Sequence, residues 1–347
     1  MDKIAIRADG STNVGMGHIM RCVAISKELQ KRNIKPIFFT KNSETTNDVL
    51  QKNKIDFVTL KSSDLDDEIQ EVETLLAQKK IDCILTDSYW LSNEYLNRLD
   101  KACKLLISID DNKLYDYPSD IIINSNIYAS DFKYPKKNEN VKLLLGCKYS
   151  ILREEFVNVP TINVNKDVRN ILVTMGGTDV NNFTPIVLNS ISDLDVNIHV
   201  IIGPGFRCTK DIIEISNKYK NINLIYNPSN MKDIMIKNDI VISASGTTTY
   251  ELGTLGIPTI LIGQADNQNN ILKKVKELGI MLSLGNFKYV TKKEIREATL
   301  KLINDYDLRL KMNKESARAI YSSGVKEIVD EIMNSLKEVN NDENRKL

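Results

Sequence analysis

The sequence lacks the features of a membrane-spanning or nucleic-acid-binding protein. Its 347 residues contain 47 lysines and arginines against 46 aspartates and glutamates, so the formal net charge is only +1. A protein without a charge excess has no field that holds a nucleic acid or an anionic membrane. No apolar run approaches the roughly 18 residues of a membrane span, and the amino terminus lacks a signal-peptide core. We therefore expect a cytoplasmic globular protein that binds a small polar ligand.

Cysteine and histidine are scarce, which limits metal and imidazole chemistry. The cysteines are Cys22, Cys83, Cys103, Cys147 and Cys208. They are odd in number and too far apart for a zinc pair or a disulfide framework, and their apolar neighbours predict reduced core residues. The histidines are His18 and His199. Any mechanism that needs an imidazole must use one of these two.

Short β-rich runs alternate with amphipathic stretches, which is typical of βα units around parallel sheets. A first series of strands is predicted at 3–9, 35–40, 56–60, 82–87, 104–110, 120–124 and 142–145. A second series is predicted at 170–175, 197–202, 223–226, 240–243 and 259–262. Several of these runs are continuously apolar, as expected for strands that helices cover on both faces. The pattern predicts an α/β protein with two Rossmann-like domains.

The weakest periodicity marks the expected domain boundary. The stretch 149–169 is polar and is interrupted by Pro160, as is typical of a linker. We therefore expect an N-terminal domain at 1–155 and a C-terminal domain at 165–318. The region that follows reads as helical, with a break at Gly324 and a last helix within 319–340.

The first candidate site is a glycine-bearing turn between a strand and a helix. Asp9 ends the first predicted strand, and Gly15 and Gly17 precede His18, where the helix begins. A helix N-terminus exposes backbone N–H groups and a partial positive charge, which suits an anion or a sugar. It also favours a neutral imidazole, which accepts a proton. His18 is therefore a candidate base, and the alternative is a histidine that only caps or packs the first turn.

Two familiar interpretations of this turn fail. A dinucleotide fingerprint needs a third glycine where Met20 stands and an acidic residue where Lys41 stands. A Walker A loop needs lysine where Met16 stands. Neither NAD nor P-loop chemistry is therefore expected. His199 lies in an apolar run and is interpreted as a satisfied strand residue.

The second candidate site follows the predicted strand 240–243. Its residues are Ser245, Gly246, Thr247, Thr248, Thr249, Tyr250 and Glu251. Glycine permits close backbone approach, the hydroxyls and free N–H groups suit a diphosphate, and Glu251 can accept from ribose hydroxyls. Alternatively, Thr247 is only an N-cap and Glu251 lies on a solvated helix flank. The amides of Asn267 and Gln268, at the next strand-to-helix junction, either contact a sugar or cap a helix.

Other polar groups end predicted strands, where parallel sheets gather ligand residues. Asp87 and Tyr89 follow one strand, and Asp110 and Asp111 follow the next. The Gly176-Gly177 turn mirrors the first glycine turn and is expected to face a pyrophosphate. All three segments are candidates to line a ligand cleft.

No metal ion or cofactor is expected. Asp64 and Asp66 look like a metal-binding carboxylate pair, but they open an acidic amphipathic stretch, so helix capping is the better account. Asp9 is interpreted as a structural or sugar-contacting residue rather than as a metal ligand.

Taken in order, these segments resemble the nucleotide-sugar hydrolases of pseudaminic acid biosynthesis, which remove UDP from UDP-2,4-diacetamido-2,4,6-trideoxy-β-L-altropyranose, and the related spore-coat polysaccharide proteins. The matching segments are 7–9, 15–22, 87–89, 110–111, 149–156, 175–179, 245–251 and 265–268. Two positions depart from the pattern: Ser88 stands where many relatives have His, and Gly10 stands where Ser is common.

The resemblance implies a GT-B fold, in which two Rossmann-like domains with parallel sheets face each other across a cleft, as in the glycosyltransferase that adds N-acetylglucosamine to lipid II. It also implies that the last helix returns to the first domain. The UDP-binding residues it implies are Ser245, Gly246, Thr247, Thr248 and Glu251. The implied substrate-binding residues are Asp9, Gly15, Gly17, Arg21, Asp87, Tyr89, Arg153, Gly176, Gly177, Asn267 and Gln268.

The activity that follows is hydrolysis of a UDP-sugar, with His18 as general base. Water is expected to attack the anomeric carbon with inversion, without a metal ion, while UDP leaves. The alternatives are a glycosyltransferase that uses the same donor and a UDP-sugar-binding protein without catalysis.

Overall fold

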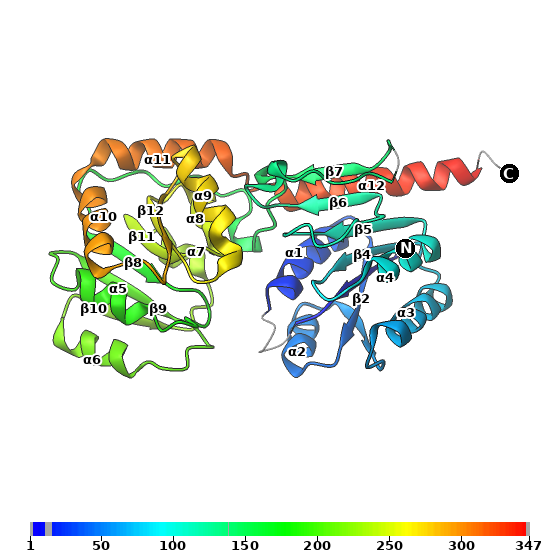
Figure 1. Cartoon of the computed structure of the whole chain (residues 1–347), viewed down its shortest axis with the longest axis horizontal. Helices are drawn as coiled ribbons and strands as arrows, with labels where there is room; N and C mark the ends of the chain where they lie inside the picture. Colours follow the sequence, from blue (N-terminus) through cyan, green and yellow to red (C-terminus); the bar gives the residue numbers. More distant parts are fainter. Residues whose placement is uncertain (1–2, 11–15, 138, 345–347) are drawn as a thin grey trace. The chain divides into compact units, whose positions relative to one another are not determined.

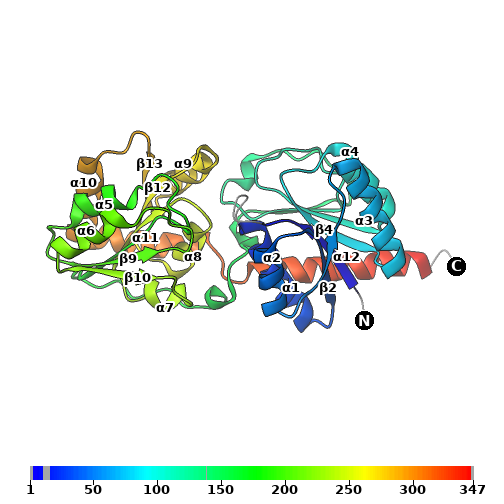
Figure 2. The same cartoon turned by 90° about the horizontal axis from the view of Figure 1, so that it is seen from below.

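The computed structural model describes residues 3–10, 16–137 and 139–344 (Figures 1 and 2). The chain divides into two compact units. The first contains Met1–Glu154 and Ser323–Leu347, and the second contains Glu155–Ser322. Each unit is built around one parallel sheet.

The first unit has a seven-stranded sheet in the order β3-β2-β1-β4-β5-β6-β7, in which every strand pair is parallel. Its strands are β1 (Lys3–Ala8), β2 (Lys35–Lys41), β3 (Asp56–Leu60), β4 (Cys83–Asp87), β5 (Leu105–Ile109), β6 (Ile121–Asn124) and β7 (Lys142–Leu145). Alternate residues of β1 face opposite sides, since side chains alternate along a strand. Ile4 and Ile6 belong to one hydrophobic cluster, and Ala5 belongs to the other.

Helices cover both faces of this sheet. The helices are α1 (Gly17–Lys31), α2 (Glu44–Lys52), α3 (Leu65–Lys79), α4 (Asn93–Ala102) and α12 (Gly324–Asn344), with short 3₁₀ turns η1 (Ala129–Asp131) and η2 (Cys147–Tyr149). Side chains of α1, α2 and α12 share one hydrophobic cluster, and those of α3 and α4 share the other. Burial on both faces explains the continuous apolar runs of the strands.

The second unit has a six-stranded parallel sheet in the order β10-β9-β8-β11-β12-β13. Its strands are β8 (Asn170–Thr174), β9 (Asn197–Ile202), β10 (Ile222–Tyr226), β11 (Ile240–Ala244), β12 (Thr259–Gly263) and β13 (Leu282–Asn286). Its helices are α5 (Thr184–Ile191), α6 (Lys210–Lys218), α7 (Met231–Met235), α8 (Thr248–Leu255), α9 (Asn269–Leu278), α10 (Lys292–Asn304) and α11 (Tyr306–Ala319), with 3₁₀ turns η3 (Glu154–Phe156) and η4 (Asp266–Gln268). Helix α5 packs against α6 and α10, and α11 packs against α8.

The prediction of two parallel-sheet α/β units is confirmed, and each predicted strand is present with ends displaced by no more than one residue. One strand was missed. The sequence Leu-Ser-Leu-Gly-Asn of β13 lacks a β-branched or apolar run, and the register shifts beside Gly285, whose φ is +93°. Asp64 caps α3 by accepting from the N–H groups of Asp66 and Asp67, as predicted.

The cysteines follow the prediction with one exception. All five are free; Cys22, Cys83 and Cys147 are buried and Cys103 is half-buried. Cys208 is exposed, so its prediction as a core residue is wrong. It lies in the loop before α6, where short polar and apolar stretches adjoin and carry no periodicity.

The last helix belongs to the first unit and begins at a glycine that nothing larger can replace. Val325, Ile328, Val329 and Ile332 of α12 join the cluster that contains the buried face of α1. A Cβ on Gly324 would lie 2.3 Å from both the backbone nitrogen and the backbone oxygen of Ser150. The close approach of two backbone segments therefore requires glycine here.

Replacing Gly324 with Ala is expected to lower the free energy of unfolding by about 1–3 kcal/mol, the usual cost of overpacking. The added methyl group would force α12 away from Ser150. Urea denaturation of the full chain measures the change, with the exposed Lys337→Ala on the same helix as control. Equal stability of the two variants would contradict this account of the helix start.

Candidate functional site

Both sheets place candidate site residues at a topological switch point. In the first sheet β1 lies between β2 and β4, and in the second β8 lies between β9 and β11. The chain therefore leaves β1 and β4, and likewise β8 and β11, in opposite directions, which opens a crevice at the carboxyl ends of those strands. The two glycine turns, the Asp87 segment and the Ser245 segment all follow these four strands. We take these two edges as the candidate functional sites.

Arg21 is the centre of a charged network at the first switch point. Its Nε and Nη2 donate to the two carboxylate oxygens of Asp87, at 2.5 Å each, and its Nη1 donates to those of Asp111, at 3.0 and 2.8 Å. Asp87 is fully buried, and the side chains of Arg21 and Asp111 are 13% and 14% exposed. One cation thus holds two carboxylates, so the group carries a net negative charge.

This network connects to His18 through Tyr89. The phenol of Tyr89 donates to Asp111 Oδ2, and its ring meets the His18 ring edge to face, with centroids 4.5 Å apart. His18 and Arg21 lie three residues apart on α1, so both point to the same side of the helix. The half-buried imidazole has no hydrogen-bond partner within residues 3–10, 16–137 and 139–344. Within this part of the chain its nitrogens are not used by another side chain or by the backbone.

Charge and burial assign protonation states within the network. Burial would raise the pKa of Asp111, but the charge of Arg21 and the hydrogen bonds from Tyr89, Arg21 and Asn126 outweigh it and lower the pKa below its usual value. Burial and the charge of Asp111 raise the pKa of Tyr89 far above its usual value. At neutral pH Asp111 is a carboxylate and Tyr89 is a neutral phenol that donates to it. Tyr89 is therefore no proton acceptor.

Asp110 and Asp111 are neighbours in sequence with different roles. Asp110 accepts from the backbone of Asn112 and Lys113 and from the phenols of Tyr117 and Tyr134, so it organises the loop after β5. Asp111 instead belongs to the Arg21 network. Sequence reasoning treated both only as cleft-lining groups.

Two members of the network were missed in the sequence. Asn126 donates to Asp111 Oδ1 at 2.8 Å, and Tyr128 donates to the Asp111 carbonyl at 3.1 Å. Both come from the loop after β6, where no motif marks them. Only the pairing of β5 with β6 brings that loop to Asp111.

Asp9 is held by structural partners. It forms an ion pair of 2.7 Å with Arg7 and accepts from the Lys41 backbone at 2.8 Å. Burial would raise its pKa, but the hydrogen bond and charge of Arg7 lower it. Gly17 is the exposed first residue of α1. Gly15 lies outside the described residues.

At the switch point of the second unit, the start of α8 is partly exposed. Gly246 and Thr248 are half-exposed and Thr247 is exposed, whereas Ser245 is fully buried. The first turn bonds Thr249 N–H to the Gly246 carbonyl and Tyr250 N–H to the Thr247 carbonyl. Residues 246–248 therefore form the surface that a diphosphate can reach.

The alternative in which this segment is only a helix cap with a solvated flank does not hold. Thr247 precedes α8, but its side chain makes no capping hydrogen bond. Glu251 is only 5% exposed, so the placement of this carboxylate on a solvated flank is wrong. Helix α8 is buried from Thr249 to Leu255, which leaves Glu251 facing inward.

The Gly176-Gly177 turn lies across the same switch point, after β8. Gly176 has a φ of +79°, which favours glycine. Asp179 holds the turn against α5 by accepting from the N–H groups of Phe183 and Thr184, at 2.8 and 2.9 Å. Gly177 is exposed, and its carbonyl accepts from the Gly205 N–H at 3.0 Å.

The remaining predicted residues differ in their exposure and in their hydrogen-bond partners. Asn267 is exposed on η4, whereas Gln268 accepts from the Gln264 N–H at 2.8 Å and so stabilises its own loop. Arg153 is half-buried just before η3. His199 donates through Nδ1 to Asn238 Oδ1 at 2.8 Å, as predicted for a satisfied strand residue.

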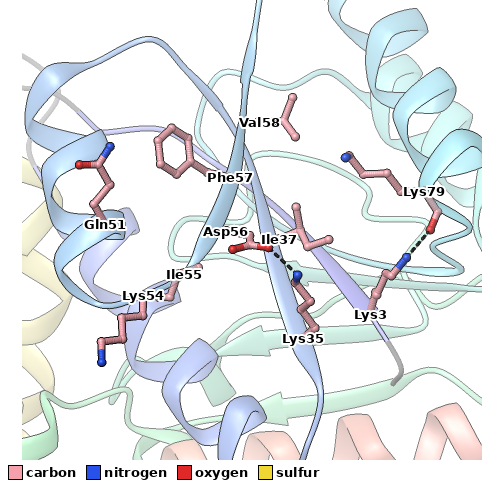
Figure 3. Close-up of a pocket in the computed structure, with 10 residues that line it drawn as sticks. All are labelled: Lys3, Lys35, Ile37, Gln51, Lys54, Ile55, Asp56, Phe57, Val58 and Lys79. Atoms are coloured by element: carbon pink, nitrogen blue, oxygen red, sulfur yellow. Dashed lines mark hydrogen bonds and ion pairs between the residues drawn. The ribbon is translucent and has the colours of Figure 1, made fainter.

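One hollow of the first unit lies away from the switch point. It has a volume of about 640 Å³ and is lined by residues at the amino ends of β1, β2 and β3, including Lys3, Lys35 and Asp56. Figure 3 shows Lys35 paired with Asp56, and Lys3 bonded to the backbone of Lys79. Both lysines therefore already have partners within the chain. The hollow also lies at the amino ends of the strands, whereas ligands of parallel sheets bind at the carboxyl ends. We do not assign a site there.

The described part of the chain contains neither a cluster of metal-ligating side chains nor a helix suited to span a membrane. Residues 3–10, 16–137 and 139–344 contain no group of three or more His, Cys, Asp or Glu side chains that could hold a metal ion. Across the same part of the chain, no helix combines the length and the apolar character needed to cross a bilayer.

Comparison with known proteins gives several relatives. Residues 170–332 match the glycosyltransferase family 28 C-terminal domain. An uncharacterized protein of Methanocaldococcus jannaschii is 33% identical over 293 residues, covering 79% of this chain and 59% of that protein. The spore coat polysaccharide biosynthesis protein SpsG of Bacillus subtilis is 25% identical over 335 residues, covering 93% and 95%. The UDP-2,4-diacetamido-2,4,6-trideoxy-beta-L-altropyranose hydrolase of Campylobacter jejuni is 26% identical over 258 residues, covering 72% and 88%.

Solved structures establish the fold class. MurG of Acinetobacter baumannii superposes with a TM-score of 0.72 at 12% identity, covering 96% of this chain and 100% of that one. The calicheamicin glycosyltransferase CalG4 gives 0.64 at 14% identity, covering 97% and 98%. At such low sequence identity, the structural likeness shows only that the folds are similar. The chain has a GT-B fold of two parallel-sheet α/β domains.

The Arg21 network makes a prediction about stability and pH. In Arg21→Gln two buried carboxylates lose their cation, which should cost about 3–5 kcal/mol of unfolding free energy at pH 7. The lowered pKa of Asp111 contributes stability above its unfolded pKa of about 3.9, and this is lost as pH falls through the folded pKa. The variant's deficit should therefore shrink as pH falls below about 4.

Urea unfolding at several pH values measures this deficit. Lys27→Gln is the matched control, because Lys27 lies on the same helix and forms an exposed ion pair with Glu154 at 3.1 Å. Its cost should stay below about 1 kcal/mol. A deficit for Arg21→Gln no larger than that of the control, or one that grows toward acid pH, would contradict the network's role.

Proposed function

We propose that the protein hydrolyses a UDP-linked 2,4-diacetamido-2,4,6-trideoxyhexose, releasing UDP and the free sugar. The resemblance in named motifs and the hydrolase from Campylobacter jejuni at 26% identity support this proposal. The observation that carries it is the placement of His18. Its ring lies at a helix start on the switch-point edge, against Tyr89, without a hydrogen-bond partner among the described residues.

The proposed reaction assigns one task to His18. A water molecule attacks the anomeric carbon while an imidazole nitrogen takes its proton. The bond from that carbon to the β-phosphate oxygen breaks, and its electron pair leaves with UDP, so the configuration inverts. The imidazolium then returns its proton to solvent.

The neighbours of His18 suit the proton-accepting role proposed for its ring. The neutral Tyr89 phenol packs against the ring and is itself fixed by Asp111. The net negative charge of the Arg21–Asp87–Asp111 group lies close to the sugar site and suits the positive charge that develops on the anomeric carbon and on imidazolium. Arg21 and Asp87 are committed to each other, so we assign them as positioning residues.

The second unit is assigned the UDP moiety. The exposed backbone of residues 246–248, at the start of α8, suits the diphosphate because helix N-termini stabilise anions. UDP is a good leaving group, so its departure needs charge stabilisation more than an acid. Gly176 and Gly177 border the same switch point and are assigned to the pyrophosphate, and Glu251 to the ribose.

Replacing His18 with Asn should reduce UDP release by about 10² to 10⁴-fold, the usual contribution of a general base. UDP affinity should not change, because the base is assigned to the sugar side. NMR of a panel of UDP-linked diacetamido sugars, with EDTA present, measures release and reports the first anomer formed. His199→Asn is the matched control, since that histidine lies on β9 and bonds to Asn238. Full activity of His18→Asn would show that His18 is not the general base.

Replacing Glu251 with Gln should weaken UDP binding about tenfold or more. A hydrogen bond to a charged acceptor is worth about 1.5–3 kcal/mol, and the variant loses the carboxylate assigned to the ribose hydroxyls. Calorimetry with UDP measures the change, and the exposed Glu214→Gln on α6 serves as control. Unchanged affinity would count against the ribose role.

A glycosyltransferase reaction from the same donor is the second candidate. It is favoured by the match of residues 170–332 to the glycosyltransferase family 28 C-terminal domain. A transferase should release UDP slowly in water and faster when a sugar or lipid acceptor is added. Fast release without any acceptor, with the free sugar as product, distinguishes the hydrolase.

A further inference from the structure

A second pocket lies beside the His18 network, at the same edge of the first sheet. Its volume is about 250 Å³, several times the roughly 30 Å³ that one water occupies in the liquid. It is bordered by the carboxyl ends of β1, β2 and β4 and by the start of α3. This is the side of the switch point where ligands of parallel sheets bind.

One wall of this pocket is apolar. It contains Leu65, Leu91 and Trp90. Trp90 is the only tryptophan in the sequence, and it is 64% exposed. An indole left open beside a pocket offers a flat surface to the apolar face of a ligand.

The lining also includes a buried guanidinium with one unused donor. Arg7 is 1% exposed and pairs with Asp9 at 2.7 Å and with Glu68 at 2.8 Å. Its Nη1 has no hydrogen-bond partner among the described residues. A buried donor without a partner carries a desolvation penalty, which a ligand acceptor can remove. The Nη1 atom is buried, and the exposed Lys41 side chain also lines the pocket.

Charges around the pocket balance. Arg7 and Lys41 are opposed by Asp9 and by the buried Glu68, which lies 3.3 Å from Lys41 Nζ. An anionic ligand would meet two carboxylates as well as two cations. The pocket therefore suits a neutral group that presents one acceptor oxygen and apolar surface.

The pocket is joined to the His18 network by three consecutive residues. Tyr89 contacts His18, while Ser88 and Trp90 line the pocket. Ser88 Oγ accepts from the Trp90 N–H at 3.1 Å, and Tyr115 donates to the Tyr89 carbonyl at 2.7 Å. Because consecutive Cα atoms are about 3.8 Å apart, the residue that contacts the imidazole and two residues that line the pocket lie in one short segment.

We propose that this pocket binds an acylamino substituent of the sugar, with the carbonyl oxygen toward Arg7 and the methyl group against Leu65, Leu91 and Trp90. This inference rests on the proposed function and names the part of the substrate that the pocket selects. It makes the segment after β4 bifunctional: Tyr89 supports the base and Trp90 supports the substituent. Acetamido sugars are then favoured over sugars with hydroxyl groups at the same positions.

The test uses the lone tryptophan as a reporter. Intrinsic fluorescence of the full chain is titrated with the methyl glycoside of a 2,4-diacetamido-2,4,6-trideoxyhexose and with the matched 6-deoxyhexose glycoside that lacks both acetamido groups. The diacetamido compound should give a saturable change with at least about fivefold tighter binding than its match, as expected for one good aromatic contact. Equal binding of the two compounds, or no change with either, overturns the proposal.

A variant gives the second arm. Trp90→Ala removes an exposed side chain and should weaken binding of the diacetamido glycoside at least fivefold by saturation-transfer NMR, with UDP affinity unchanged. Tyr289→Ala, at an aromatic that is 80% exposed in the second unit, is the control. Undiminished binding by Trp90→Ala overturns the proposal.

The two proposals fail separately. Saturable, Trp90-dependent binding without UDP release would sustain the pocket and overturn the hydrolase. His18-dependent hydrolysis with the same KM in wild type and Trp90→Ala would sustain the hydrolase and overturn the pocket.

Discussion

The candidate site of the first unit depends on the pairing of one guanidinium with two carboxylates. Asp87 is fully buried, and a buried carboxylate without a cation is costly. Arg21 provides that cation and at the same time fixes Asp111, which in turn accepts from Tyr89. The edge-to-face contact of Tyr89 with His18 then orients the imidazole. This series of contacts therefore begins in the core at Asp87 and ends at the His18 ring.

The same constraint of sheet topology acts in both units. A parallel sheet that winds outward from a central strand in two directions leaves a crevice at the carboxyl end of that strand. In each unit the two loops at this crevice contain glycine or small hydroxyl residues next to a helix start. The first unit adds ionisable and aromatic side chains, whereas the second offers mostly backbone N–H groups. This difference matches the assignment of sugar chemistry to one unit and of diphosphate binding to the other.

The loop after β4 links the site to the pocket beside it. Asp87 is anchored in the core, Tyr89 touches the imidazole, and Trp90 is open to solvent. Tyr115 holds this loop by donating to the Tyr89 carbonyl, and Tyr128 donates to the carbonyl of Asp111, whose carboxylate accepts from the Tyr89 phenol. The proposed positioning and recognition roles therefore fall on adjacent residues of one segment.

Local signals in the sequence were sufficient for the strands, for the helix capped by Asp64 and for the segments that meet the switch points, because apolar period and glycine-bearing turns act over a few residues. They identified His18 and the start of α8 for the same reason. They missed β13, whose polar composition hides a strand that only its pairing with β12 supports. They also misplaced Cys208, since burial depends on which face neighbouring elements cover. The partnership of Arg21 with Asp87 and Asp111, the contribution of Asn126 and the unused donor of Arg7 were decided by the tertiary structure alone, because ion pairs and hydrogen bonds join residues that are distant in the chain and close only once the strands have paired.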